Sequence, residues 1–220
     1  MSNILTIGLH CEGTTDERFL LSVIKRTFDA VALECVSQLE VYEPQRVASA
    51  GGNFVEAVKQ AATEAHRQGL MVLCVHADAD APDDRTAFDF KLTPALFAVA
   101  AAPPGAPPRA LPVAVVPVRT TEAWMLADAG LLRDEIGSLP AQADLPAHPE
   151  KVANPKEVIE EAIRLALADR PRRHRDQLQI GDLYQPLGQK IPLHKLELLP
   201  SYRKFKEAVR SVYRELNYLV

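Results

Sequence analysis

The hydrophobic positions in the first part of the chain follow two patterns. Residues 4–10 and 70–75 are short, continuous apolar runs, which is typical of strands buried on both faces of a sheet. Apolar residues at helical spacing follow at 19–28 and again at 54–66, so each of these stretches predicts an amphipathic helix. A strand, a tight glycine turn and a helix in succession favour a parallel α/β sheet.

The alternation of strand and helix continues beyond residue 75. The pattern predicts a helix at 88–101, a strand at 112–118 and a short helix at 122–127, in addition to a strand at 33–43 earlier in the chain. A proline-rich stretch at 101–108 cannot hold regular structure and predicts a stiff surface loop.

The composition changes near residue 137. Prolines become frequent, and helices are predicted over 156–168 and 201–218 with an irregular stretch between them. About 80 residues of this kind form only a thin core by themselves. We therefore expect a mostly parallel α/β domain over residues 1–136, with helices flanking the sheet, and a helical extension over 137–220 packed on it.

Composition and charge narrow the class of protein. The 220 residues are 47% hydrophobic and 25% charged, which excludes collagenous and wholly disordered chains. The net charge is −4, so any contact with nucleic acid must be local, metal-assisted or supplied by a partner. No apolar run approaches the roughly 18 residues of a membrane span, and we expect a cytoplasmic protein with no membrane partner. Cys11, Cys35 and Cys74 lie far apart and are predicted to be core thiols.

Acidic residues follow three of the predicted strands. Since parallel strands end at the same edge of a sheet, we expect these side chains to converge. Crowded carboxylates repel one another unless a cation lies among them, and hard oxygen ligands favour Mg²⁺ or Mn²⁺ over zinc. The sequence therefore predicts a divalent metal site, and its candidate ligands are Glu12, Asp16, Asp78, Asp80 and Glu122.

Some of these acids have an alternative structural interpretation. Asp16 lies in the first turn of a predicted helix, where the helix dipole favours any acid. Thr14 and Glu17 have the spacing of a capping box, which makes Glu17 a cap rather than a ligand. Glu122 is also compatible with an acid at a helix N-terminus, and Trp124 is expected in the core.

Three short motifs stand at the ends of the predicted strands. They are Glu12-Gly13-x-x-Asp16, Asp78-x-Asp80 and the run Thr-Glu-Ala-Trp-Met-Leu-Ala-Asp at 121–128. In this order they resemble the Toprim domain, in particular small stand-alone Toprim-like proteins often encoded beside ATPases. The first motif also resembles the Glu-x-x-x-Asp arrangement of overcoming-lysogenization-defect nucleases. The likeness covers about residues 4–130, with a weaker likeness over 191–205.

The resemblance implies a fold and an activity. It implies parallel strands flanked by helices, with Glu12, Asp78 and Asp80 as metal carboxylates and Asp16 as a ligand of a second ion. The expected activity is Mg²⁺- or Mn²⁺-dependent hydrolysis of phosphodiester bonds by an endonuclease, with DNA favoured over RNA as substrate. It also implies an ATPase partner and a role in phage or mobile-element defence.

Basic residues are candidates for contacts with the phosphates. Lys190 is a candidate for assisting the leaving group, although a surface lysine is the simpler interpretation. Arg119, at the end of the last predicted strand, is a comparable candidate. A cluster of arginines is a candidate contact with nucleic acid, and it consists of Arg170, Arg172, Arg173 and Arg175. The alternative interpretation of this cluster is a solvated loop between helices.

Two other classes of protein remain open. A haloacid-dehalogenase-type phosphatase also uses Asp-x-Asp at a strand end, but that pair belongs on the first strand, and a Thr or Val stands where this chain has Pro82. A non-catalytic interaction subunit with the Toprim shape would reach nucleic acid through its ATPase partner. A Mg²⁺-dependent activity of the chain alone distinguishes the nuclease from the interaction subunit.

Overall fold

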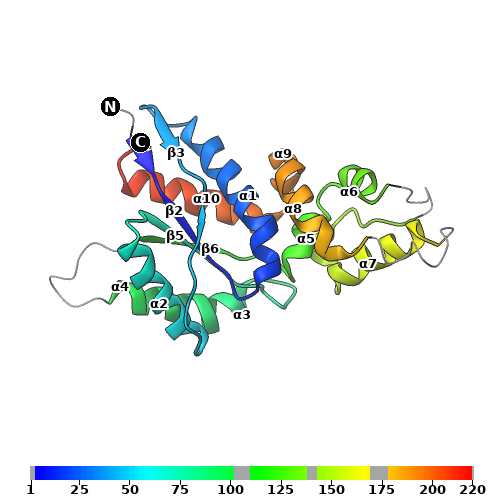
Figure 1. Ribbon diagram of the computed structural model, residues 1–220, viewed down its shortest axis with the longest axis horizontal. Coiled ribbons are helices and arrows are strands. Elements are labelled where there is room, and N and C mark those ends of the chain that lie inside the picture. The colour runs from blue at the N-terminus through cyan, green and yellow to red at the C-terminus, as the bar shows by residue number, and fades with distance from the viewer. Residues whose placement is uncertain (1–2, 102–109, 138–142, 169–177, 220) are drawn as a thin grey trace.

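The centre of the protein is a four-stranded sheet in which every pair of neighbouring strands is parallel (Figure 1). The computed structural model of the protein describes residues 3–101, 110–137, 143–168 and 178–219. The predicted α/β class with a parallel central sheet is therefore confirmed. In spatial order the strands are β4 (Gln45–Arg46), β2 (Ile7–His10), β5 (Val72–His76) and β6 (Leu111–Val115).

The apolar run at 70–75 forms a central strand, as its pattern predicts. In β5 the side chains of Val72 and Cys74 belong to the core on one face of the sheet, and those of Leu73 and Val75 belong to the core on the other. A strand whose two faces are both buried needs apolar residues at successive positions, which explains the continuous run.

The N-terminal apolar run forms two strands rather than the single one predicted. β1 (Asn3–Leu5) pairs with β3 (Leu39–Val41) in a separate parallel pair, and β2 joins the central sheet. The chain changes sheets at Thr6, whose Oγ1 donates to the carbonyl oxygen of Gly69 and accepts from the amide of Met71, both at 3.1 Å. The strand predicted over 33–43 is limited to the three residues of β3.

Helices cover both faces of the sheet (Figure 1). α1 (Thr14–Ala32) and α10 (Pro200–Glu215) pack on one face, and α2 (Phe54–Arg67) and α4 (Thr93–Ala100) pack on the other. None of the described helices is long and apolar enough to cross a membrane. The remaining helices are α3 (Arg85–Ala87), the π-helix η1 (Phe88–Leu92), α5 (Thr121–Met125), α6 (Ala129–Ile136), the 3₁₀ helix η2 (Pro149–Lys151), α7 (Pro155–Ala166), α8 (Ile180–Lys190) and α9 (Leu193–Leu196).

α8 lies in a stretch that the sequence predicted to be irregular. It contains Pro186 and two glycines, which weaken a helix in isolation. Packing against α1 stabilises it: a Cβ atom on Gly188 would lie 2.5 Å from the carbonyl oxygen of Phe19, and Arg26 donates to the carbonyl of Gly188 at 3.1 Å. The close approach of the two helices needs the glycine, so a residue that looked like a helix breaker is a contact residue.

The C-terminal helices share one hydrophobic core with the sheet. Trp124 is fully buried, as expected, and its Nε1 donates to Ser201 Oγ on α10 at 2.7 Å. Tyr202 of α10 packs edge-to-face against its indole ring, and Phe205 packs against it at a tilt. All three cysteines are free; Cys74 is buried, and the other two are partly buried.

Candidate active site at the carboxyl edge of the sheet

The loops that follow β5 and β6 continue to pair beyond the ends of the strands. The amide of Ala79 donates to the carbonyl of Pro117 at 3.1 Å, and the amide of Asp80 donates to the carbonyl of Arg119 at 2.8 Å. Asp80 and Arg119 both have left-handed φ angles, 52° and 67°, which are uncommon for residues other than glycine. Such strain accumulates at functional sites because the surrounding structure must maintain it.

A lysine joins two of the predicted ligands. Lys91 Nζ lies 3.1 Å from Glu12 Oε2 and 3.7 Å from Asp80 Oδ2. Glu12 follows β2 and Asp80 follows β5, so side chains from two neighbouring strands converge on one positive charge. The structure therefore brings two of the five predicted ligands to one place, and their common partner is an ammonium group.

The sequence did not identify Lys91 as a site residue. It is the one basic residue of the helix predicted over 88–101, which was the only available signal. The residue lies in η1, a π-helical stretch between α3 and α4, where the helical turn is wider than in an α-helix. π-helical turns occur frequently at functional sites, and this one places Lys91 beside the carboxylates.

Asp78 is oriented by contacts of its own with His76 and Thr121. Its Oδ1 accepts from the amide of Thr121 at 2.9 Å and lies 3.2 Å from His76 Nε2. Thr121 Oγ1 is 3.2 Å from the same imidazole nitrogen, so a buried histidine and a helix N-terminus position this carboxylate. Both of the closest of these contacts use Oδ1.

Asp16 and Glu122 complete the acidic edge. Burial raises the pKa of Asp16, with further increases from Asp78 and Glu122, whereas His76 lowers it. Glu122 is buried, and its Oε1 accepts from Tyr184 Oη at 2.6 Å. Tyr184 was missed because α8 was not predicted.

The turn before α1 is arranged differently from the predicted capping box. The N-cap residue of α1 is Gly13, which has no side chain to cap the helix. Glu17 instead forms an ion pair with Arg46 of β4 at 2.9 Å. A Cβ atom on Gly13 would lie 2.8 Å from Asp16 Oδ2, so the carboxylate of Asp16 folds back over the glycine. This packing explains the Gly13-x-x-Asp16 spacing.

The donor set has the chemistry of a Mg²⁺ or Mn²⁺ site. All five predicted ligands provide carboxylate oxygens, which these hard cations prefer. Two of them, Glu12 and Asp80, already share a cation, the ammonium of Lys91. Within the described residues, no group of three or more His, Cys, Asp or Glu side chains is gathered closely enough to hold an ion. The donor types suit a hard cation, but their arrangement among the described residues does not form a metal site.

The other predicted contact residues have different outcomes. Lys190 is the last residue of α8 and forms an ion pair with Glu135 of α6 at 2.6 Å. Along α8 it is six residues, or about 9 Å, from Tyr184, which contacts Glu122. The structure does not bring it to the carboxylates. Arg119 adjoins Asp80 through its backbone, and its Nε is buried without a hydrogen bond in the described part of the chain. The arginine cluster at 170–175 lies outside the described residues.

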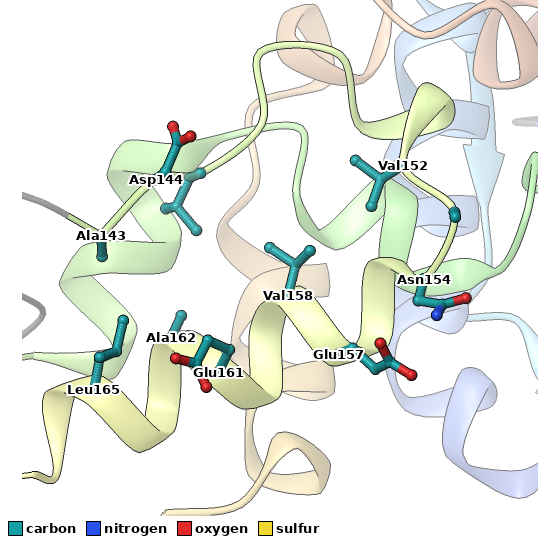
Figure 2. Close-up of a pocket in the computed structure, with 11 residues that line it drawn as sticks. Ala143, Asp144, Val152, Asn154, Glu157, Val158, Glu161, Ala162 and Leu165 are labelled. Atoms are coloured by element: carbon teal, nitrogen blue, oxygen red, sulfur yellow. The ribbon is translucent and has the colours of Figure 1, made fainter.

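A hollow of about 510 Å³ lies away from this edge, along α7 (Figure 2). Its described lining includes the acidic side chains of Asp144, Glu157 and Glu161 and the apolar side chains of Val158 and Leu165, and none of the described lining residues is basic. Negative charge disfavours a phosphate-bearing ligand there. Among the described residues that line the hollow, none is a predicted site residue.

Comparison of this chain with known proteins found no relative. No family model, no curated protein and no solved structure matches this chain. The chemistry of the site is therefore inferred from its own residues. Asp78 and Asp80 follow β5, which is the third strand of the central sheet along the chain, whereas a haloacid-dehalogenase-type phosphatase would have them on the first.

Proposed function

We propose that this protein is a Toprim-like nuclease that hydrolyses phosphodiester bonds of nucleic acid with Mg²⁺ or Mn²⁺. The observation that carries the proposal is the convergence of Glu12 and Asp80, from two neighbouring parallel strands, on a single positive charge. Carboxylates converge in this way where a site is built for a cation at the carboxyl edge of an α/β sheet.

Each residue at the edge has a separate role in the proposed site. Glu12 and Asp80 hold the ion, and Asp78, whose orientation is fixed by the Thr121 amide and the His76 imidazole, is the third candidate ligand. Asp16 adds negative charge for a second ion. When bound, the ion supplies charge neutralisation at the phosphate and makes water more acidic.

The openness of the site favours a polymeric substrate. The side chain of Asp80 is 69% exposed and that of Glu12 is 40% exposed, so these ligands lie on a surface rather than in an enclosed pocket. Small-molecule sites are usually concave and bury most of their ligand. A nucleic-acid strand can reach an open edge, and with a net charge of −4 the chain benefits from a partner such as an ATPase to bind it. DNA is the favoured substrate because of the motif resemblance.

The test is a cleavage assay on the purified chain, alone and with any ATPase encoded beside it. Supercoiled plasmid, single-stranded DNA and structured RNA are incubated with Mg²⁺ or Mn²⁺. We expect nicking by the wild type and its loss in Glu12→Gln and in Asp80→Asn, which keep side-chain size but remove the charge of a ligand. The control variant is Glu157→Gln, which removes a carboxylate charge in the hollow along α7. This variant should cleave the substrates as the wild type does.

A non-catalytic interaction subunit is the second candidate. It is favoured by the Lys91 ion pairs, which engage two of the proposed ligands, and by the lack of a three-ligand group within the described residues. If confirmed metal binding is accompanied by no cleavage of any substrate, with or without the ATPase, this function replaces the nuclease. Cleavage that survives both ligand variants comes from a contaminant.

A further inference from the structure

We propose that the outward side of the continuous helical segment formed by η1 and α4 is a dimerisation surface, on which a second copy of this chain packs about a two-fold axis. The inference is independent of the activity proposed above. We call this surface the α4 stripe, and its exposed residues are Phe90, Thr93, Pro94, Phe97, Ala100 and Ala101.

The composition of α4 is the first step. Apart from Thr93, every residue of α4 is apolar. A helix that is apolar all round is normally buried all round. The fold buries one side of this helical segment, where Leu92, Ala95 and Val99 belong to the core. The α4 stripe is the other side, and it is exposed although its residues suit burial.

The neighbouring helix α2 shows that this exposure is unusual for the molecule. α2 covers the same face of the sheet and contacts α4 (Figure 1). Its outward residues Glu56, Lys59, Gln60 and Thr63 are polar and exposed, which is the ordinary pattern of a helix facing water. Contiguous exposed apolar residues instead mark interaction surfaces.

The spacing of the two rings favours a second copy as the occupant. Phe90 and Phe97 are at equal distances in sequence from a centre between Thr93 and Pro94, and none of the six residues of the α4 stripe is charged. A two-fold axis through this centre pairs the segment with itself in antiparallel orientation. Phe90 of each copy then meets Phe97 of the other, and the smaller residues lie at the axis. Such self-complementarity is what a two-fold interface requires.

The area of the α4 stripe fits a weak dimer. Phe90 is 77% exposed and Phe97 is 74% exposed. A phenylalanine can bury about 200 Å², so the four rings of a dimer bury about 600 Å². The smaller residues of both copies add to this area and bring it toward the lower limit of a specific interface, about 1,200 Å² in total. We therefore expect association that depends on concentration.

Sedimentation velocity of the full chain tests the inference. The wild type should change from monomer to dimer as its concentration rises from about 1 to about 500 µM, the behaviour of a weak interface. Phe90→Glu and Phe97→Glu should each weaken association by about tenfold or more, because each buries two unpaired charges per dimer. Leu33→Glu is the matched control. Leu33 is 89% exposed just after α1, outside the α4 stripe, and this variant should dimerise as the wild type does.

A mixture of two charge variants tests the antiparallel arrangement. In a pair formed by Phe90→Lys and Phe97→Glu, the two opposite charges meet and the two remaining rings meet. We expect the mixture to associate about threefold or more tightly than either variant alone, the range of an exposed ion pair. A mixture no tighter than its components would overturn the antiparallel arrangement.

Two results would overturn the dimerisation surface itself. One is a wild type that stays monomeric over the whole concentration range, and binding of this monomer to neutral lipid vesicles would assign the α4 stripe to a membrane instead. The other is a dimer that Phe90→Glu and Phe97→Glu leave unchanged, because its interface would then lie elsewhere on the molecule.

Discussion

The amide of Asp80 donates to the carbonyl oxygen of Arg119 at 2.8 Å, and both residues are in the left-handed region of backbone conformation. Asp80 follows β5 and Arg119 follows β6, so this bond fastens together the two loops that carry the acidic edge. Aspartate tolerates this conformation better than arginine does, because its short side chain can hydrogen-bond locally. Most of the strain therefore lies at Arg119.

This strain predicts the order of stability of two variants. Arg119→Ala keeps the steric penalty of a Cβ atom at positive φ, and Arg119→Gly removes it. We expect the glycine variant to be more stable than the alanine variant by about 1 kcal/mol, as measured by urea unfolding. Arg18, in the regular helix α1, provides the control, because glycine there should be less stable than alanine by about 1 kcal/mol. If alanine is more stable than glycine at position 119 as well as at position 18, the backbone of Arg119 is not strained.

The hydroxyl of Tyr184 should contribute more to stability than an ordinary buried tyrosine hydroxyl. It donates to the buried carboxylate of Glu122 at 2.6 Å, and Tyr184→Phe leaves that charged group without the donor. We expect a loss of about 2 kcal/mol in the free energy of unfolding. Tyr213→Phe is the matched control, because its hydroxyl donates to the neutral carbonyl of Phe28 at 2.9 Å, and its loss should be about 1 kcal/mol. Equal losses would show that Glu122 does not need the hydroxyl.

Divalent ions should stabilise the folded protein if the proposed site exists. A ligand that binds only the native state raises its melting temperature, so Mg²⁺ or Mn²⁺ should raise that of the wild type. Asp78→Asn combined with Asp80→Asn should erase the response, and chelation of the ion should reverse it. The pair Asp144→Asn and Glu157→Gln removes two carboxylates from the hollow along α7 and should leave the response intact. If neither Mg²⁺ nor Mn²⁺ changes the melting temperature of the wild type, the proposed site does not bind these ions.

An ion pair between α10 and the end of α1 predicts a pH dependence of stability. Arg210 donates from Nε and a terminal nitrogen to the two carboxylate oxygens of Glu34, both at 2.8 Å, and lowers the pKa of Glu34 below its ordinary value of 4.5. A carboxyl with a lower pKa in the folded state stabilises the protein above pH 4.5. This contribution is lost as the pH falls from 4.5 through the folded pKa.

The measurement is urea unfolding as a function of pH for the wild type and Glu34→Gln. The two proteins should differ in stability above pH 4.5, and the difference should shrink below it because the variant has no carboxyl to protonate. Glu40→Gln, an exposed residue of β3, should show no such convergence. A difference that stays constant down to pH 3 would exclude the ion pair as its cause.

The sequence by itself determined the class of fold and the place of the acidic residues. The apolar run at 70–75 specifies a strand buried on both faces, because only such a strand needs apolar side chains at successive positions. With β5 in the centre, Asp78 and Asp80 necessarily emerge at the carboxyl edge, and the same logic places Glu12 after β2. These conclusions depend on local periodicity and on strand direction, which are properties of the chain itself.

Only the tertiary structure decided which partners these acids have. Lys91 meets Glu12 across 79 positions of sequence, and Tyr184 meets Glu122 across 62, distances at which spacing along the chain carries no information. α8 forms because Gly188 lets it pack closely on α1, although its proline and glycines predict irregular structure. Long-range packing outweighs local propensity here, since the energy of burying an apolar helix face exceeds the fraction of a kilocalorie by which most residues differ in helix preference.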